Sequence, residues 1–329
     1  MKILIIGNED RYNKYMPDLE ITREMEKVFC PRGASDEALL QAAQDADAIA
    51  IDPMSKLSGN VIRQMPKLKL IQSEGVGFNG IDCQAAKEKG IYVCNCKGAN
   101  AGAVAEQTIL LMLALLRSTI TGDRVEREGR QIELKERLMY EGITELGDCR
   151  IGLVGFGDIA KAVAKRLRPF ECEIIYYDTR RLPEKLEEEY HVSYMELDEM
   201  IQACDIISLH CPVTKETAGM VNAEFLGKMK PTAYLINTAR GDIIDNQALY
   251  DAIVTEKIRG AGLDTVYPEP TTKDNILLNL PDEFKERIIF SPHIGGITTS
   301  SFRRAHKISW SNVEAVLNGE RPQYIVNGL

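Results

Sequence analysis

The histidine in the stretch FSPHIGG, residues 290–296, is the first candidate for chemistry, because the chain has only four histidines. His293 follows the strand-like run 287–290 and precedes Gly295 and Gly296. A histidine titrates near neutral pH, and loop residues at strand ends often carry function. The two glycines allow the backbone to approach another group closely. We therefore predict that His293 is an acid/base residue, with an inert polar loop position as the alternative.

Two other strand-end segments carry polar residues next to special backbone. INTARGD places Arg240 directly before Gly241, and LDTVYPEP places Asp264 at a strand end and Glu269 between two prolines. A redox site for a hydroxyl/ketone pair needs a cation for the substrate carboxylate, a proton carrier and a carboxylate that tunes it. Arg240, His293 and Glu269 would supply these three groups. The alternatives are a surface ion pair for the arginine and a plain loop charge for the glutamate.

A glycine-rich turn in RIGLVGFGDIA indicates a dinucleotide site. Gly155, Gly157 and Ala160 form the pattern GxGxxA between a predicted strand and a predicted helix, and Asp178 closes the next strand. Gly155 would make the tight turn, Gly157 would admit the pyrophosphate, and Ala160 would keep helix and strand close. The helix N-terminus would offer unpaired N–H groups to the phosphates.

The acidic residue after the second strand favours NAD over NADP. Asp178 should accept hydrogen bonds from the adenosine ribose hydroxyls and repel a 2′-phosphate. Arg180 and Arg181 follow directly and are the type of residue that holds such a phosphate. We predict NAD as the cofactor, with NADP less favoured.

Short apolar strands alternate with amphipathic helices along the chain, and the pattern restarts at residue 150. It predicts an α/β fold of two doubly wound parallel-sheet domains, a flavodoxin-like substrate domain and a Rossmann NAD-binding domain, with a cleft between them. We assign residues 1–98 and 297–329 to the substrate domain and 99–296 to the dinucleotide-binding domain. The charged, weakly patterned stretch 121–147 should be a connection or protruding arm. The tail PQYIVN should return to the first domain.

Composition excludes several classes of function. The formal charge is −9 and no Lys/Arg block occurs, which argues against nucleic-acid binding. The most apolar stretch, 103–116, carries Glu106 and is too short to span a bilayer, so we expect a buried helix there and no membrane partner. Without a secretory signal we expect a cytoplasmic protein whose eight cysteines are reduced. No CxxC occurs, and we predict no metal site.

Six motifs in order make the chain resemble the D-isomer-specific 2-hydroxyacid dehydrogenase family, and the resemblance covers nearly the whole chain. They are SEGVGFNGID (73–82), GANAGAVAE (98–106), GLVGFGDIA (152–160), NTARGD (237–242), LDTVYPEP (263–270) and SPHIGG (291–296).

The resemblance implies a 2-oxo acid reductase that forms the D-2-hydroxy acid, and the reverse reaction. It implies that NADH gives hydride to the substrate C2 and that His293, kept cationic by Glu269, gives the proton. Arg240 would bind the substrate carboxylate and carbonyl oxygen, and the backbone N–H groups of Val76 and Gly77 would hold the carboxylate. The cofactor residues implied are Gly155, Gly157, Asp158, Ile159, Asp178, His210, Pro212, Thr217, Thr238, Ala239, Asp264 and Gly295; of these, His210 has a packing role as its preferred interpretation.

The resemblance also implies a homodimer formed through the cofactor domain, helped by residues 100–147, and domain closure with crossings near 98–100 and 296–300. Lys97, Phe78 and Asn79 depart from the family pattern. Lys97 stands where proline is common, either as a neutral hinge variant or as an added cation. Glu74 precedes the substrate loop and argues against a doubly anionic substrate.

A different class of function stays open beside the enzyme. Some members of the superfamily resemble NAD(H)-binding redox sensors or corepressors with little turnover, and they keep the same three polar residues. The acidic charge of the chain favours the enzyme. The motifs leave open which 2-oxo acid is used and in which direction the reaction runs.

Overall fold

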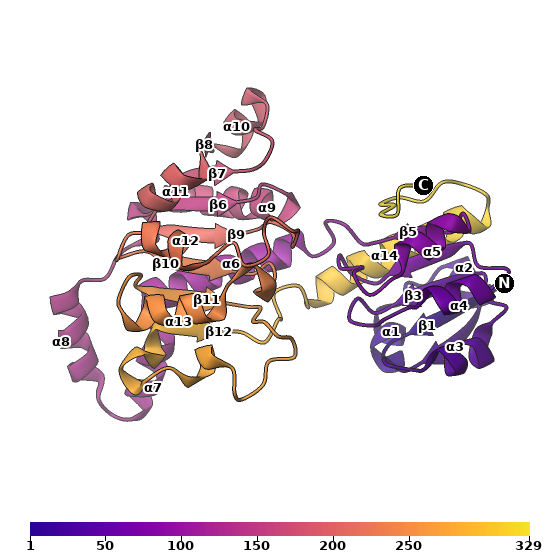
Figure 1. Cartoon of the computed structure of the whole chain (residues 1–329), viewed down its shortest axis with the longest axis horizontal. Coiled ribbons are helices and arrows are strands. Elements are labelled where there is room, and N and C mark those ends of the chain that lie inside the picture. The colour runs from indigo at the N-terminus through magenta and orange to yellow at the C-terminus, as the bar shows by residue number, and fades with distance from the viewer. The chain divides into compact units, whose positions relative to one another are not determined.

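The computed structural model describes residues 1–329 and divides into two compact units, drawn in Figure 1. Unit 1 comprises Met1–Asn100 and Ile297–Leu329, and unit 2 comprises Ala101–Gly296. Each unit contains a single parallel sheet with helices on both faces. The predicted fold class, two doubly wound α/β domains, is confirmed.

Unit 1 is built on a five-stranded sheet in the order β2-β1-β3-β4-β5. The strands are β1 (Lys2–Ile6), β2 (Glu26–Cys30), β3 (Ala48–Ile51), β4 (Leu70–Ser73) and β5 (Tyr92–Cys94). Its helices are α1 (Glu9–Tyr15), α2 (Glu20–Glu24), α3 (Asp36–Ala43), α4 (Gly59–Gln64), α5 (Cys83–Glu88) and α14 (Thr299–Leu317). One buried core lies on the α3–α5 face, and a second, centred on Tyr12 and Trp310, lies on the face covered by α1, α2 and α14.

The order of strands in unit 1 reverses at β1. β1 pairs with β2 on one side and with β3 on the other. The connection from β1 to β2 and the connection from β2 to β3 therefore run in opposite directions across the sheet. Ligands of such sheets bind beyond the carboxyl ends of the strands at this reversal. The C-terminal tail also belongs to unit 1, as expected: Ile325 forms an antiparallel bridge with Cys94, and Val326 N donates to Val93 O.

Unit 2 is built on a seven-stranded parallel sheet in the order β12-β11-β10-β9-β6-β7-β8. The strands are β6 (Arg150–Val154), β7 (Glu173–Tyr177), β8 (Ser193–Tyr194), β9 (Ile206–Leu209), β10 (Tyr234–Asn237), β11 (Gly260–Leu263) and β12 (Ile288–Phe290). Its α-helices are α6 (Ala101–Leu116), α7 (Thr119–Arg127), α8 (Gln131–Glu141), α9 (Asp158–Leu167), α10 (Glu184–Tyr190), α11 (Leu197–Ala203), α12 (Ala223–Lys228) and α13 (Asn246–Val254). Short 3-10 turns are η1 (Leu146–Asp148), η2 (Arg168–Phe170), η3 (Gly241–Ile243), η4 (Ile276–Asn279) and η5 (Asp282–Arg287).

Helices cover both faces of the sheet in unit 2, which explains why its strands are continuous apolar runs. Two buried cores lie in unit 2. α6 packs on α9, β10, β11 and β12 around one of them, whereas α12 contacts both α11 and α13 around the other. Most residues of α6 are buried, as its all-round apolarity predicts. No single helix is long and apolar enough to cross a membrane; α6 and α7 meet those criteria only as a pair bent by 59°.

Several elements were not predicted individually, among them α1, α2, β2 and β8. β2 begins with Glu26 and Lys27 and lies at a sheet edge, where charged residues are common, so its run of apolar residues is short. β8 has two residues. The stretch 121–147, predicted only as a connection or arm, contains most of α7 and all of α8, and α8 has no buried residue.

Candidate active site

His293 and Glu269 meet at the carboxyl edge of the sheet in unit 2. His293 lies in the loop after β12, and Glu269 lies in the loop after β11. The Nδ1 atom of His293 pairs with Oε1 of Glu269. The two side chains are 33% and 34% exposed, so the imidazole is fixed by the carboxylate and still reachable. Because Nδ1 is engaged, Nε2 is the ring nitrogen that can meet another molecule.

Asp264 holds the histidine loop in its unusual conformation. His293 has φ +54°, in the left-handed region that costs a side-chain-bearing residue energy. The buried Asp264 carboxylate accepts hydrogen bonds from Ser291 Oγ, Ile294 N (3.0 Å) and Gly295 N (2.9 Å). Its carbonyl accepts His293 N at 2.8 Å. The resemblance implied that this aspartate is a cofactor residue; within unit 2 it organises the loop that carries His293.

Arg240 lies at the end of β10, one strand from β11, and Gly241 explains its position. A Cβ atom at Gly241 would lie 2.3 Å from the backbone nitrogen of Tyr267, so only glycine lets this turn contact the segment leading to Glu269. Asn237 Nδ2 donates to the Arg240 carbonyl at 2.9 Å. The Arg240 guanidinium makes one hydrogen bond, to the Ala239 carbonyl at 2.7 Å, and most of its donors are free.

The glycine turn after β6 fits a dinucleotide. Gly155 has φ +87°, and a Cβ there would lie 2.9 Å from Cys211 N, so the ends of β6 and β9 approach through this glycine. β6 and β9 form the reversal point of the sheet, where dinucleotides bind. A Cβ at Gly157 would meet nothing within 4 Å, and no side chain caps α9, which begins at Asp158. The helix therefore presents unpaired N–H groups to open space, as a pyrophosphate requires.

Asp178 lies beside this turn, and the two arginines that follow it differ. Phe156 N donates to Asp178 Oδ2 at 2.7 Å, which fixes the carboxylate against the glycine turn. Arg181 is committed elsewhere: it pairs with both oxygens of Glu187 at 2.9 and 3.0 Å and covers the ring of Tyr194. Arg180 is exposed and its side chain makes no hydrogen bond or ion pair. Arg180 is therefore the arginine with no partner in the protein, whereas Arg181 would have to leave Glu187 to bind a ligand in a fork.

The remaining predicted cofactor residues lie at the same edge of the sheet. Thr217 Oγ1 donates to the Pro212 carbonyl at 2.6 Å and shapes the turn after β9. Thr238 is buried and bonds to Thr108 Oγ1 at 2.8 Å, and Ala239 N donates to Asn237 Oδ1 at 3.0 Å. Burial lowers the pKa of His210 to about 3, and its Nε2 lies 2.9 Å from Ser208 Oγ.

The loop predicted to hold the substrate carboxylate belongs to unit 1 and follows β4. Its carbonyl groups are all engaged: Gly75 O accepts Cys96 N, Val76 O accepts Asn95 Nδ2, and Gly77 O accepts Ser73 Oγ, at 2.6–2.8 Å. The N–H groups of Val76 and Gly77 have no partner. Such free N–H groups bind anions. Lys97, the departure near this loop, is exposed.

Sequence reasoning missed the residues that support the site. Ser291 and Gln107 complete the Asp264 network, with Gln107 Nε2 donating to Ser291 Oγ at 3.0 Å. Ser73 and Asn95 fix the loop in unit 1. Ser291 lies within a recognised motif, but a hydroxyl or an amide alone carries no pattern that distinguishes support from solvent exposure.

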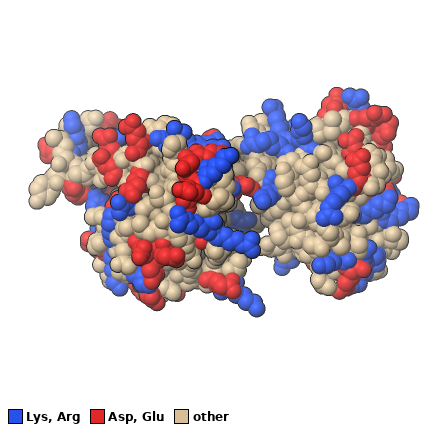
Figure 2. All heavy atoms as spheres, turned by 90° about the horizontal axis from the view of Figure 1, so that it is seen from above, with Lys and Arg blue, Asp and Glu red and all other residues tan.

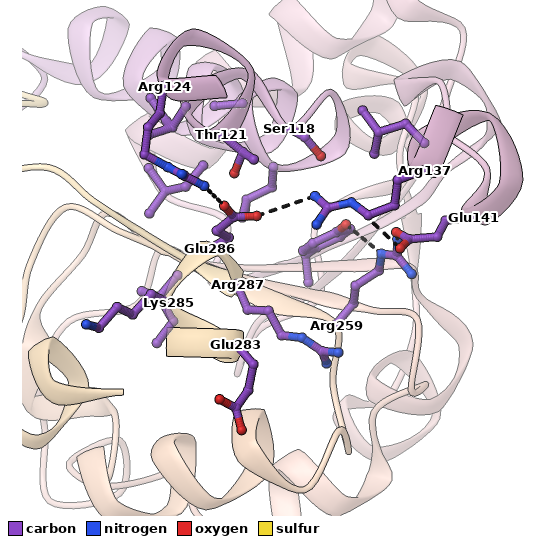
Figure 3. Close-up of a pocket in the computed structure, with 17 residues that line it drawn as sticks. Ser118, Thr121, Arg124, Arg137, Glu141, Arg259, Glu283, Lys285, Glu286 and Arg287 are labelled. Carbon is purple, nitrogen blue, oxygen red and sulfur yellow. Dashed lines mark hydrogen bonds and ion pairs between the residues drawn. The ribbon is translucent and has the colours of Figure 1, made fainter. Parts of the chain in front are cut away.

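A sizeable cavity lies elsewhere in unit 2. Figure 3 shows a cavity of about 620 Å³ lined by residues of α6, α7, α8 and η5 and by Tyr234, Arg259 and Ile288, which stand at the amino ends of strands. Three of its arginines pair with acids that also line it: Arg124 and Arg137 with Glu286, and Arg259 with Glu141. Strands of a parallel sheet all run one way, so this cavity is at the edge opposite His293.

Figure 2 shows one face of the molecule, on which basic and acidic side chains are both present on each unit.

Comparison with known proteins assigns the family. The sequence model described as "D-isomer specific 2-hydroxyacid dehydrogenase, NAD binding domain" matches residues 109–295. The chain belongs to the D-isomer-specific 2-hydroxyacid dehydrogenase family. Unit 2 thus contains the family's NAD-binding domain, and NAD is the cofactor it binds.

Relatives in this family carry the names of reductases. A glyoxylate reductase of Thermofilum pendens is 38% identical over 89% of this chain and 85% of its own length. A hydroxypyruvate reductase of Thermotoga maritima is 36% identical over 90% of this chain and 92% of its own. The NAD complex of a D-isomer-specific 2-hydroxyacid dehydrogenase from Lactobacillus delbrueckii ssp. bulgaricus superimposes with a TM-score of 0.81 over 99% of this chain and 100% of that chain, at 26% identity. The family acts on 2-oxo and 2-hydroxy acids with a nicotinamide cofactor, and this chain is an oxidoreductase of that kind.

Proposed function

We propose that the chain reduces a small 2-oxo acid to the D-2-hydroxy acid, with His293 as the proton donor. The observation that carries the proposal is the pairing of His293 Nδ1 with Glu269 at the carboxyl edge of an NAD-binding sheet, one strand from Arg240. NADH, when bound, supplies the hydride to C2 of the substrate. The other steps fall to residues of this chain.

His293 transfers the proton through its free nitrogen. Glu269 fixes the orientation of the ring, since its carboxylate pairs with Nδ1 and leaves Nε2 free. Nε2–H then donates to the alkoxide that develops at the substrate C2 oxygen. Oxidation of the hydroxy acid returns the same proton to Nε2.

Arg240 binds the substrate. A guanidinium has five donors, and this one uses a single donor within the protein, so it can hold a carboxylate and the oxygen at C2 together. We also propose that the free N–H groups of Val76 and Gly77 contribute to binding the carboxylate. Neither group carries a proton in the reaction, so both act by orientation and charge.

Steady-state kinetics with a panel of acids tests the proposed function. The relatives named glyoxylate reductase and hydroxypyruvate reductase make glyoxylate and hydroxypyruvate the first substrates to assay, followed by pyruvate and by branched and aromatic 2-oxo acids. We expect oxidation of NADH and, from prochiral acids, the D product. Tight binding of NADH without turnover of any acid would favour the redox-sensor alternative.

We expect NAD rather than NADP to be the cofactor. Asp178 would accept hydrogen bonds from the ribose hydroxyls, and Phe156 N fixes its carboxylate beside the glycine turn. Arg181 is already paired with both oxygens of Glu187. Only Arg180 remains to offset the repulsion between Asp178 and a 2′-phosphate.

We propose a homodimer that uses the α7–α8 arm of unit 2. α8 has eleven residues, none of them buried, and carries Met139 (76% exposed) and Tyr140 (94% exposed). A helix of this length is marginal without packing. An apolar groove lined by Val125, Leu134, Leu138 and Ile143 lies between the two helices. Sedimentation should show a dimer that Tyr140→Lys weakens; an unchanged dimer would place the interface elsewhere.

A further inference from the structure

A buried ion network lies at the carboxyl edge of the sheet in unit 1, next to the substrate loop. Arg11, on α1, pairs with two acids at once: Nη1 lies 2.7 Å from Asp52 Oδ2, and Nη2 lies 2.5 Å from Glu74 Oε2. The carboxylates are 2% and 4% exposed, and the guanidinium side chain is 24% exposed. A second arginine, Arg32, reaches the same oxygen of Asp52 at 2.8 Å.

The two acids occupy equivalent places in the chain. Asp52 directly follows β3 and Glu74 directly follows β4. The next residues, Pro53 and Gly75, are in tight contact, since a Cβ at Gly75 would lie 2.8 Å from Pro53 Cγ. Arg11 therefore fixes both residues that precede this contact, and Gly75 is the first residue of the loop.

The loop itself has no other charged attachment. Neutral groups hold its three carbonyls, and its N–H groups at Val76 and Gly77 are left free. The direction in which those N–H groups point depends on where the chain enters the loop, at Glu74. Glu74 N also donates to Ile51 O at 2.9 Å, which aligns the ends of β3 and β4.

The structure corrects the interpretation of Glu74 made from the sequence. A negative charge next to the substrate loop was expected to repel a second anionic group on the substrate. The carboxylate instead turns into unit 1 and is paired with Arg11, so its charge is compensated and away from solvent. The argument against doubly anionic substrates therefore falls.

We infer that Arg11 is a positioning residue for catalysis, which acts through Asp52 and Glu74 to fix the carboxylate-binding N–H groups of the 75–77 loop. The inference rests on the proposed function of that loop. Buried pairs of this kind are strongly affected by the loss of one partner, because the other charge is left uncompensated. Losing Arg11 would leave Glu74 without its only ion partner and free the entry to the loop.

The test is a comparison of KM and kcat in three variants with the best 2-oxo acid of the panel. Arg11→Gln should raise KM for the acid by about tenfold, while kcat changes by less than about threefold and NADH affinity stays unchanged. Glu74→Gln, which keeps the shape and one hydrogen bond, should raise KM by about threefold. Because both changes disrupt one interaction, the double variant should resemble Arg11→Gln rather than the product of the two effects.

Arg23→Gln is the matched control. Arg23 pairs with Asp18 in the same unit, but both side chains are mostly exposed, so KM should not change. Fluorescence of Trp310, the only tryptophan and buried in unit 1, reports whether each variant is folded. An unchanged KM in folded Arg11→Gln, or in Glu74→Gln if the first variant does not fold, overturns the inference. A wild-type protein inactive toward every 2-oxo acid would instead refute the proposed function, before any variant is made.

Discussion

The carboxyl edges of the two sheets hold similar sets of charged residues and use them differently. In unit 2, the side chains of His293 and Glu269 are each about one third exposed, and the Arg240 guanidinium makes one hydrogen bond within the protein. In unit 1, Asp52 and Glu74 are almost fully buried, and Arg11 is committed to both of them. The first set can meet a substrate, whereas the second set can only act on the backbone around it.

The difference shows that the residue type at a strand end does not by itself reveal its role. An arginine next to a functional loop can read a carboxylate of the substrate or fix the loop that does so. The number of donors that the protein leaves free separates the two cases. We propose that Arg240 belongs to the first case and Arg11 to the second.

Replacement of Arg240 should lower kcat/KM more than any change at the carboxyl edge of unit 1. We expect Arg240→Lys to lower kcat/KM for the 2-oxo acid on the order of 100-fold, because a lysine cannot bind the carboxylate and the carbonyl oxygen in a fork. NADH affinity, measured by fluorescence titration, should not change. Arg259→Lys, at the opposite edge of the same sheet, is the control and should leave kcat/KM as it is. A small effect at residue 240 would show that this guanidinium is structural, as Arg11 is.

Replacement of Asp178 should have an intermediate effect on cofactor choice. Asp178→Ala removes the charge that repels a 2′-phosphate, so the ratio of kcat/KM for NADPH to that for NADH should rise by about tenfold. Arg181→Ala should leave this ratio unchanged, because Glu187 already occupies that side chain. An equal loss of NADPH use in Arg181→Ala and Arg180→Ala would contradict the distinction drawn between the two arginines.

The smallest effect concerns the pH dependence of stability in unit 1. Burial raises the pKa of Glu74 to about 7, against the opposing effect of Arg11, so the folded state retains a proton that the unfolded chain releases near its usual value of 4.5. Glu74 therefore contributes stability that is fully present below about pH 4.5 and is lost as the pH rises through about 7. Relative to Glu74→Gln, the wild type should lose at most about 1.4 kcal/mol per pH unit in this range.

Trp310 fluorescence during urea unfolding measures this difference within unit 1. The other titrating groups are the same in the wild type and in Glu74→Gln, so their contributions to the pH dependence cancel. His306 is one of them: it is buried with both ring nitrogens unpaired, and burial lowers its pKa to about 4. Arg11 and Tyr12 on α1, Arg32, Asp52 and Cys96 also face this region and are common to both. A difference in unfolding free energy that is independent of pH would contradict the burial of an ionisable Glu74.

The fold and the pairing of His293 with Glu269 could be predicted because both leave local signals. Apolar runs alternate with helices, and polar residues follow strands next to glycine or proline. The Arg11–Glu74 pair has no such signal, since its members are 63 positions apart and Arg11 lies in no recognised motif. β2 was missed because its first residues are charged, and α8 because it buries no residue in its own unit.

A single-turnover experiment on His293→Gln tests the central claim most directly. Enzyme saturated with NADH is mixed with the 2-oxo acid, and oxidation of the reduced nicotinamide is followed through one turnover, so that substrate affinity and product release do not contribute. His191→Gln is the control, since His191 also has a positive φ, of +53°, but lies exposed at the end of α10. We predict a rate constant at least about 100-fold lower than wild type for His293→Gln and an unchanged one for His191→Gln. Equal rate constants in all three proteins would show that the imidazole at 293 does not carry the proton.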